Sequence, residues 1–287
     1  MVFLTCRTDF PWDMTRALEL ALFRTFCIPS ISELLDRTQE FCLRPQRRYD
    51  DTDIIVSEIM EHGYDSERGL AAIRRMNQIH GRFEISNDDF LYVLSTFVFV
   101  PIRWLDNFGW RKLLPAEKEA MFYFWREVGR RMNIKSLPED SASFERFSQE
   151  YEGRHYQFTE SNRRVGAATR ELFASWFPRP FKPLVRRGIH ALLDAPLREA
   201  FGFPKPGGLM RWLVPAALRM RGRLLKVWPR RKKPLLRTEM KHRSHPEGYT
   251  METIGPPGNA GGGCPFHSHN PTGLSPAAGH SSAGLRQ

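Results

Sequence analysis

Apolar residues recur at helical spacing along this chain, and no stretch alternates apolar and polar residues as a half-buried strand does. One stretch follows Asp65 and Ser66 and places apolar side chains on one helix face, at Leu70, Ile73, Met76 and Ile79. Prolines and glycines separate such stretches where helices begin and end. The pattern therefore predicts an all-α fold of about 9 to 12 helices around one core.

The most apolar run covers residues 90–100. It is too short to cross a bilayer, because a spanning helix needs about 20 apolar residues. Pro101 and Arg103 follow it, so we expect the run to end there. The interpretation is a buried core helix and not a membrane span.

The chain has 287 residues, enough for one sizeable core, and we predict a single helical domain over residues 1–257. Residues 258–287 are rich in glycine, proline and serine and hold too few apolar groups to offset the entropy of ordering, so a disordered tail is expected. Cys264, His267 and His269 lie in this tail. They resemble a metal cluster, but nothing around them would orient the ligands, so we interpret the match as incidental.

The net charge of +11 is unevenly distributed. Residues 178–245 carry 18 Lys and Arg against 3 acids, a net +15, and the rest of the chain carries −4. A solvated basic face explains this, and so does a patch that meets anionic lipid. From Gly208 to Lys233 basic residues are interspersed among apolar ones in the manner of a membrane-surface helix, although packing on the core remains open. No nucleic-acid module is recognisable.

The start of the chain predicts a cytoplasmic protein. Arg7 and Asp9 interrupt the first residues before a signal-peptide core could form. The four cysteines, Cys6, Cys27, Cys42 and Cys264, show no paired spacing, and we expect them to be reduced.

Residues 44–81 hold the first candidate site. Arg48 and Thr52 are four apart and share a helix face, and His80 falls at the end of the next helix. A haem needs one axial nitrogen, cations for its propionates and an apolar wall. Arg48, Arg74 and Arg75 could supply the cations, because a guanidinium matches a carboxylate. A histidine at a helix end is also commonly structural, so both interpretations stand.

A second candidate is Glu152 with His155, whose E-x-x-H spacing occurs in di-iron carboxylate bundles. Such sites need two copies of the motif together with two further glutamates, and we interpret the match at Glu152 and His155 as a chance one. Serine-hydrolase, phosphate-loop, zinc-protease and dinucleotide motifs are absent from the sequence. These absences leave hydrolase, kinase and nicotinamide chemistry without support.

The sequence resembles the family that groups rubber oxygenases (latex-clearing proteins) with the ER-bound oxygenase of mycophenolic acid biosynthesis. The resemblance covers residues 10–257 and is closest to the mycophenolic-acid branch. It rests on FRTFCIPSIS (23–32), RRYDDT (47–52), RMNQIHG (75–81), NDDFLYVLS (87–95), GWR (109–111), GRRM (129–132), PEGY (246–249) and IGP (254–256).

The resemblance implies a globin-like helical domain that binds haem b and uses O₂ to cleave a carbon–carbon double bond in a lipophilic substrate such as a prenylated small molecule. The family's R-x-x-x-T motif falls on Arg48 and Thr52, and its haem-ligating histidine falls on His80. Rubber oxygenases have a lysine before the motif threonine, whereas this chain has Asp51. The alternatives are a non-catalytic haem- or lipid-binding protein at a membrane surface and, less favoured, a di-iron oxygenase.

Overall fold

The structure, a computed structural model, describes residues 1–256, and the predicted disordered tail lies outside them. Over this range the fold is all-α, as predicted. The elements are α1 (Val2–Leu4), the π-helix η1 (Thr5–Asp9), α2 (Pro11–Thr25), α3 (Pro29–Thr38), α4 (Glu40–Leu43), α5 (Pro45–His62), α6 (Glu67–His80), α7 (Asn87–Phe108), α8 (Pro115–Arg131), α9 (Ser141–His155), α10 (Glu160–Ser175), η2 (Arg179–Phe181), α11 (Lys182–Leu192), α12 (Ala195–Phe201), α13 (Gly208–Val227) and η3 (Met251–Thr253).

Prolines and caps set many of the helix starts. Helices α2, α3, α5 and α8 each begin at a proline, whose missing N–H costs nothing in the first turn. Ser66 caps α6 by accepting a hydrogen bond from the Gly69 N–H, and Ser86 caps α7 in the same way. These boundaries follow directly from the sequence signals.

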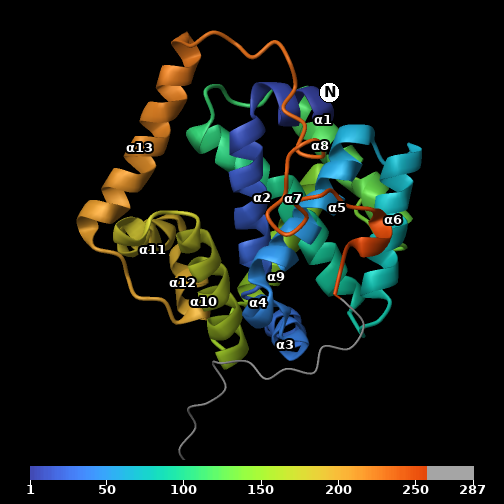
Figure 1. The fold of residues 1–287 in the computed structure, drawn as a ribbon, viewed down its shortest axis with the longest axis horizontal. Helices are drawn as coiled ribbons and strands as arrows, with labels where there is room; N and C mark the ends of the chain where they lie inside the picture. The colour runs from blue at the N-terminus through green and yellow to red at the C-terminus, as the bar shows by residue number, and fades with distance from the viewer. Residues whose placement is uncertain (257–287) are drawn as a thin grey trace, which may run out of the picture.

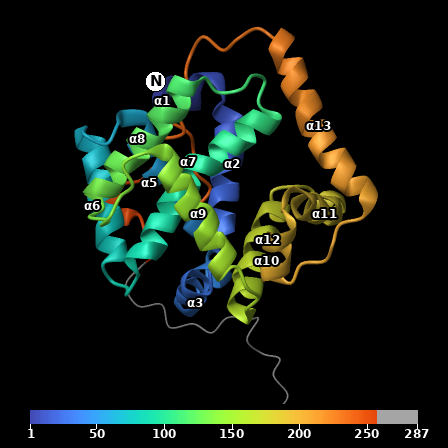
Figure 2. The same cartoon turned by 180° about the vertical axis from the view of Figure 1, so that it is seen from behind.

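Helix α7 is central in both views and packs along α2, α8 and α9 (Figures 1 and 2). Much of its length is buried, as expected for residues 90–100. The expected end at Pro101 is wrong, because the helix continues to Phe108 with the proline inside it. Buried side chains on both sides of Pro101, among them Phe99 and Trp104, hold the helix together across the missing N–H. In the part of the chain that the structure describes, no helix has the length and apolar character to span a bilayer.

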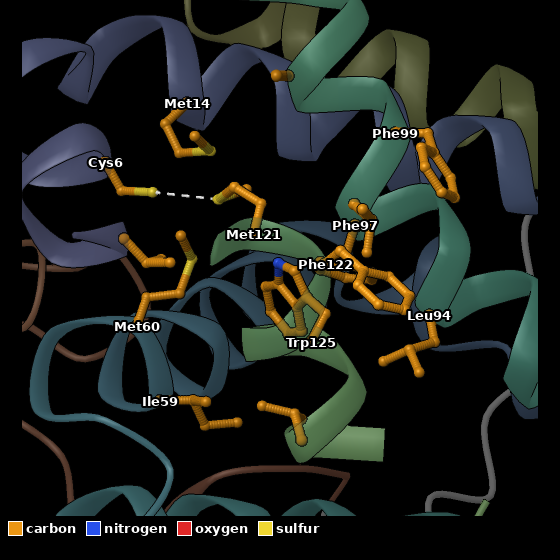
Figure 3. Packing of buried hydrophobic residues seen from close by; sticks show 14 of the residues in the cluster. Cys6, Met14, Ile59, Met60, Leu94, Phe97, Phe99, Met121, Phe122 and Trp125 are labelled. Carbon is orange, nitrogen blue, oxygen red and sulfur yellow. Dashed lines mark hydrogen bonds between the residues drawn. The ribbon is translucent and has the colours of Figure 1, made fainter. Parts of the chain in front are cut away.

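A sulfur-rich cluster fills the core between η1, α2, α5 and α8 (Figure 3). Cys6 Sγ lies 4.0 Å from Met121 Sδ, and Met14 and Met60 pack nearby with the Trp125 ring. Burial raises the pKa of the Cys6 thiol to about 12, so it stays protonated. This part of the core is therefore packed by unreactive, polarisable sulfur groups.

The cysteine prediction holds in part. Cys6 and Cys27 are free and buried, as expected of reduced thiols. Cys264, with the tail histidines His267 and His269, lies outside the described residues.

The segment that follows α13, residues 235–256, is here called the C-terminal strap. It crosses back over α5 and ends beside α6 (Figure 1). Five acidic side chains of α5 accept hydrogen bonds from it: Asp50, Asp51, Asp53, Glu58 and Glu61. The strap is thus attached along α5 through the carboxylates of this helix.

Helix α13 lies at the edge of the molecule (Figures 1 and 2), where it contacts α11 and α7. Helices α10 to α12 form a second small core with the end of α2, centred on Phe23 and Phe201, whose ring centroids are 4.8 Å apart.

Candidate functional site

A cavity of about 620 Å³ lies between α3, α5, α6, α7 and α8. Its volume is in the range of about 300–1,000 Å³ that is usual for cofactor and small-molecule sites. Most of the wall is apolar, and Figure 3 shows four of its residues, Ile59, Leu94, Phe97 and Trp125. The polar and charged residues in the wall are Thr25, Ser30, Thr38, Glu40, Arg48, Asp51, Thr52, His80, Arg82, Glu84 and Asp89.

His80, in the last turn of α6, lines this cavity. Its Nδ1 is buried and has no hydrogen-bond partner among the described residues. Burial, and after it the positive charge of Arg48, lowers the pKa of His80 to about 4. The imidazole is therefore neutral at physiological pH, which is the state that binds a metal.

Arg48 and Thr52 lie on the α5 wall of the same cavity, as their spacing predicts. Arg48 Nη1 donates to Thr52 Oγ1, and the Thr52 hydroxyl donates to the Arg48 carbonyl at 3.1 Å. Within residues 1–256 the guanidinium has no salt bridge, and desolvation lowers its pKa even though the Asp51 and Glu40 carboxylates oppose this. A half-buried cation that has a hydrogen bond but no ion pair attracts an anionic group.

Asp51 also lines the cavity, but its carboxylate is occupied by the strap. His245 Nε2 lies 2.8 Å from Oδ1, and the Gly255 N–H donates to Oδ2 at 3.0 Å. The contact places Gly255 and Pro256 in the cavity wall. Gly255 has a φ of 105°, and a Cβ there would lie 2.7 Å from Ile79 Cδ1, so the strap ends at a position that requires glycine.

Arg74 and Arg75 are not among the residues that line the cavity. Arg74 is exposed on the outer face of α6. Arg75 donates to the Ile254 carbonyl from Nε at 2.8 Å and to the Glu252 carbonyl from Nη2 at 3.0 Å, so it fixes the strap. We therefore leave both arginines out of the proposed site.

The di-iron alternative does not fit the positions of its residues. Glu152 forms a two-pronged ion pair with Arg24, at 3.0 and 2.7 Å, and accepts from the Tyr92 hydroxyl. The His155 ring stacks on Tyr151 with centroids 4.0 Å apart. Among the described residues no group of three or more His, Cys, Asp or Glu could hold a metal ion. The Glu152 network is structural.

Two contributions to the site were missed from the sequence. The strap residues Gly255 and Pro256 close the wall from far along the chain, and helical periodicity gives no signal for that contact. Asp89 of α7 also lines the cavity, where it accepts from the hydroxyls of Ser30 and Tyr151. Asp89 stands in the first turn of α7, where an acid is favourable in any case, so its position in the sequence does not mark it as a cavity residue.

The residues present fit a flat, largely apolar cofactor that carries a metal and anionic groups. A neutral imidazole with a free nitrogen and an unpaired guanidinium face one apolar cavity. His80 would hold the metal, and Arg48 would bind an anionic group of the cofactor. This combination meets the requirements of a haem site.

The comparisons with known proteins agree on one family. The model of the ER-bound oxygenase mpaB/B′/rubber oxygenase catalytic domain matches residues 18–225. The chain is 29% identical over 215 residues to the ER-bound oxygenase mpaB of Penicillium roqueforti (strain FM164), covering 68% of this chain and 72% of that protein. It is 29% identical over 220 residues to mpaB′ of Penicillium brevicompactum, and 31% identical over 192 residues to mpaB of the same species.

These two matches cover 69% and 60% of this chain, but only 52% and 49% of the relatives. The chain thus spans about half the length of the Penicillium brevicompactum proteins. The matched family model covers α5, α6 and α7 in full, and these helices carry Arg48, Thr52 and His80. The chain belongs to the family of the ER-bound oxygenase mpaB/B′ and rubber oxygenase catalytic domains.

Proposed function

We propose that this chain is a haem b-dependent oxygenase that uses O₂ to cleave or oxidise a carbon–carbon double bond in a lipophilic, for instance prenylated, small molecule. The observation that carries the proposal is the pairing of a neutral, unpartnered His80 imidazole with the Arg48 cation in one apolar cavity. The names of the relatives, ER-bound oxygenases, support the reaction class.

When bound, haem supplies the activation of O₂. The chain supplies binding and orientation. His80 would hold the iron through its neutral ring. Arg48, fixed by its contact with Thr52, binds a carboxylate, either of the haem or of the substrate. The apolar side chains of α3 and α7 align an alkene and exclude water.

A non-catalytic haem-binding role is the alternative, and the cavity argues against it. Electron-transfer haems commonly hold the iron with a second protein ligand. His80 is the only histidine among the described residues that line the cavity. The described wall therefore offers no second imidazole to a bound haem, which favours the oxygenase over a haem held by two histidines.

The test is the absorption spectrum of the haem-supplemented protein, with iron content and a pyridine haemochrome assay. The parent is expected to show a Soret band that is lost or shifted in His80→Ala, because the axial nitrogen is removed. His155→Ala is the matched control, since His155 stacks on Tyr151 away from the cavity. A colourless parent, or an unchanged spectrum in His80→Ala, contradicts the proposal.

We also propose that α13 rests on an anionic membrane surface. Leu209, Leu213, Met220, Leu224 and Val227 are all exposed, and their spacing of three, four or seven places them on one face. Arg219, Arg223 and Lys226 are exposed beside that stripe, and residues 208–233 contain no acid. An exposed apolar stripe flanked by bases fits a surface of negatively charged headgroups.

Co-sedimentation with vesicles tests this contact. The parent is expected to bind phosphatidylserine-containing vesicles at low salt and to bind pure phosphatidylcholine weakly. Leu224→Glu should weaken binding by about tenfold or more, because it removes an inserted side chain and adds a repelled charge. Leu114→Glu is the control, because Leu114 is equally exposed (59% against 60%) on another face. Binding that does not depend on the lipid charge or on the salt concentration contradicts the proposed contact of α13 with an anionic membrane.

A further inference from the structure

A second, much smaller chamber lies behind the α5 wall of the cavity. Its volume is about 30 Å³, enough for one or two water molecules at roughly 10–15 Å³ each. Charged and hydroxyl side chains surround it, among them Arg7, Thr15, Glu19, Tyr49, Asp53 and Arg237. A polar chamber of this size is suited to hold ordered water.

The chamber and the cavity share part of their walls. Leu22, Thr52, Val56 and Phe97 line both spaces. Of these four, Thr52 has the only polar side chain. The Thr52 hydroxyl is thus the one side-chain polar group among the described residues that borders both the chamber and the cavity with His80.

Two acids line the chamber, Asp53 and Glu19, and only Asp53 is held by two contacts with an arginine. Asp53 lies in a two-pronged ion pair with Arg237. Glu19 accepts from the Tyr49 hydroxyl and from Arg16, both at 2.6 Å and both on Oε1. No described residue donates to its Oε2. The side chain is only 11% exposed.

We propose that Glu19 is the proton-exchanging group of the cavity, linked to it by water in the chamber and by the Thr52 hydroxyl. This inference rests on the proposed haem function. In the forward step a donor in the cavity loses a proton and keeps the bonding electron pair, and Glu19 Oε2 gains the proton, so the carboxylate becomes a neutral acid. The return step reverses this, and no oxidant or reductant is consumed.

The protonation behaviour of Glu19 suits this role. Burial raises its pKa from 4.5 to about 7, against the opposing effects of Arg16 and the Tyr49 hydrogen bond. The charged and titratable groups that face it are Arg16 on α2, Tyr49 and Asp53 on α5, Arg237 on the strap and, across the chamber, Arg7 of η1. Burial and neighbouring acids raise the pKa of Tyr49 far above neutrality, so Glu19 is the group that exchanges protons near pH 7.

The test is cyanide binding to the ferric haem-loaded protein, followed by the Soret shift in stopped flow from pH 5 to 9. Hydrogen cyanide binds iron as the anion, so its proton must be accepted inside the cavity. In the parent we expect the association rate to change around pH 7. Glu19→Gln should lower the rate by about tenfold or more and remove that inflection, because an amide accepts no proton. Thr52→Val should do the same.

Thr15→Val is the matched control. Thr15 lines the chamber but not the cavity, and its hydroxyl donates to the Pro11 carbonyl at 3.0 Å. This variant should keep the parent rate and inflection. Parent-like kinetics in Glu19→Gln overturn the inference, and parent-like kinetics in Thr52→Val overturn the link through Thr52. A parent protein that forms no Soret band overturns the haem function itself and the inference with it.

Discussion

Glu61→Ala is expected to lower the free energy of unfolding by about 3–5 kcal/mol, the usual cost of removing one partner from a buried charge pair. The Glu61 side chain is fully buried. It accepts from the Arg237 N–H at 2.8 Å and from the Thr238 hydroxyl at 2.6 Å. Arg7 Nε lies 2.8 Å from Oε1 as an ion pair, although the angle is outside the range of a hydrogen bond. The variant leaves the buried Arg7 guanidinium without its counter-charge.

Urea unfolding followed by circular dichroism measures this loss. Glu119→Ala is the control, because Glu119 is exposed on α8 and should change stability by about 0.5 kcal/mol or less. A Glu61→Ala protein as stable as the control refutes the assigned role of this carboxylate. The strap of that variant should also become more sensitive to limited proteolysis, since three of its hydrogen bonds to α5 are lost.

Glu19→Gln should change the pH dependence of stability. The folded pKa of Glu19, about 7, is above the unfolded value of 4.5, so the folded state binds more protons between these limits. The contribution of protonated Glu19 to the free energy of unfolding is fully present below pH 4.5 and is lost as the pH rises through 7. A proton held this much more tightly corresponds to about 3 kcal/mol. Glutamine does not titrate. Between pH 4.5 and 8 the free energy of unfolding of the variant should therefore rise by about 3 kcal/mol relative to that of the parent.

Chemical denaturation of both proteins at a series of pH values measures the difference. Other groups titrate in the same range, notably His80, whose pKa is lowered to about 4. Their contributions cancel when the variant is subtracted from the parent. A difference that stays constant with pH means that Glu19 has the same pKa in the folded and unfolded states, which contradicts the prediction. Because no haem is needed, this result is independent of the cyanide kinetics.

The helices were largely predictable because their signals are local. The capping serine before α6 and the proline that opens α8 act within one turn of the chain. The end at Pro101 was mispredicted because tertiary packing overrides the local cost of a proline. Local rules therefore give helix starts more dependably than helix ends.

The site was predictable only where the family pattern marks it. Arg48, Thr52 and His80 do line one cavity. The sequence does not show that Arg74 is exposed and that Arg75 contacts the strap. Helix periodicity gives the face on which a residue lies but not the segment that covers this face. Glu19 gave no signal, because it lies within an ordinary apolar helix pattern and depends on Tyr49 and Arg237 from distant segments.

The strap also orders events during synthesis. Helices α5 and α6 leave the ribosome early, yet Gly255 and Pro256, which complete the cavity wall, emerge about 175 residues after His80. Until then the α5 carboxylates and the cavity face water. The wall is therefore incomplete on that side while the chain is still growing. Residues 255 and 256 complete it only after all the helices have been made, so the order of the sequence sets the order in which the cavity is built.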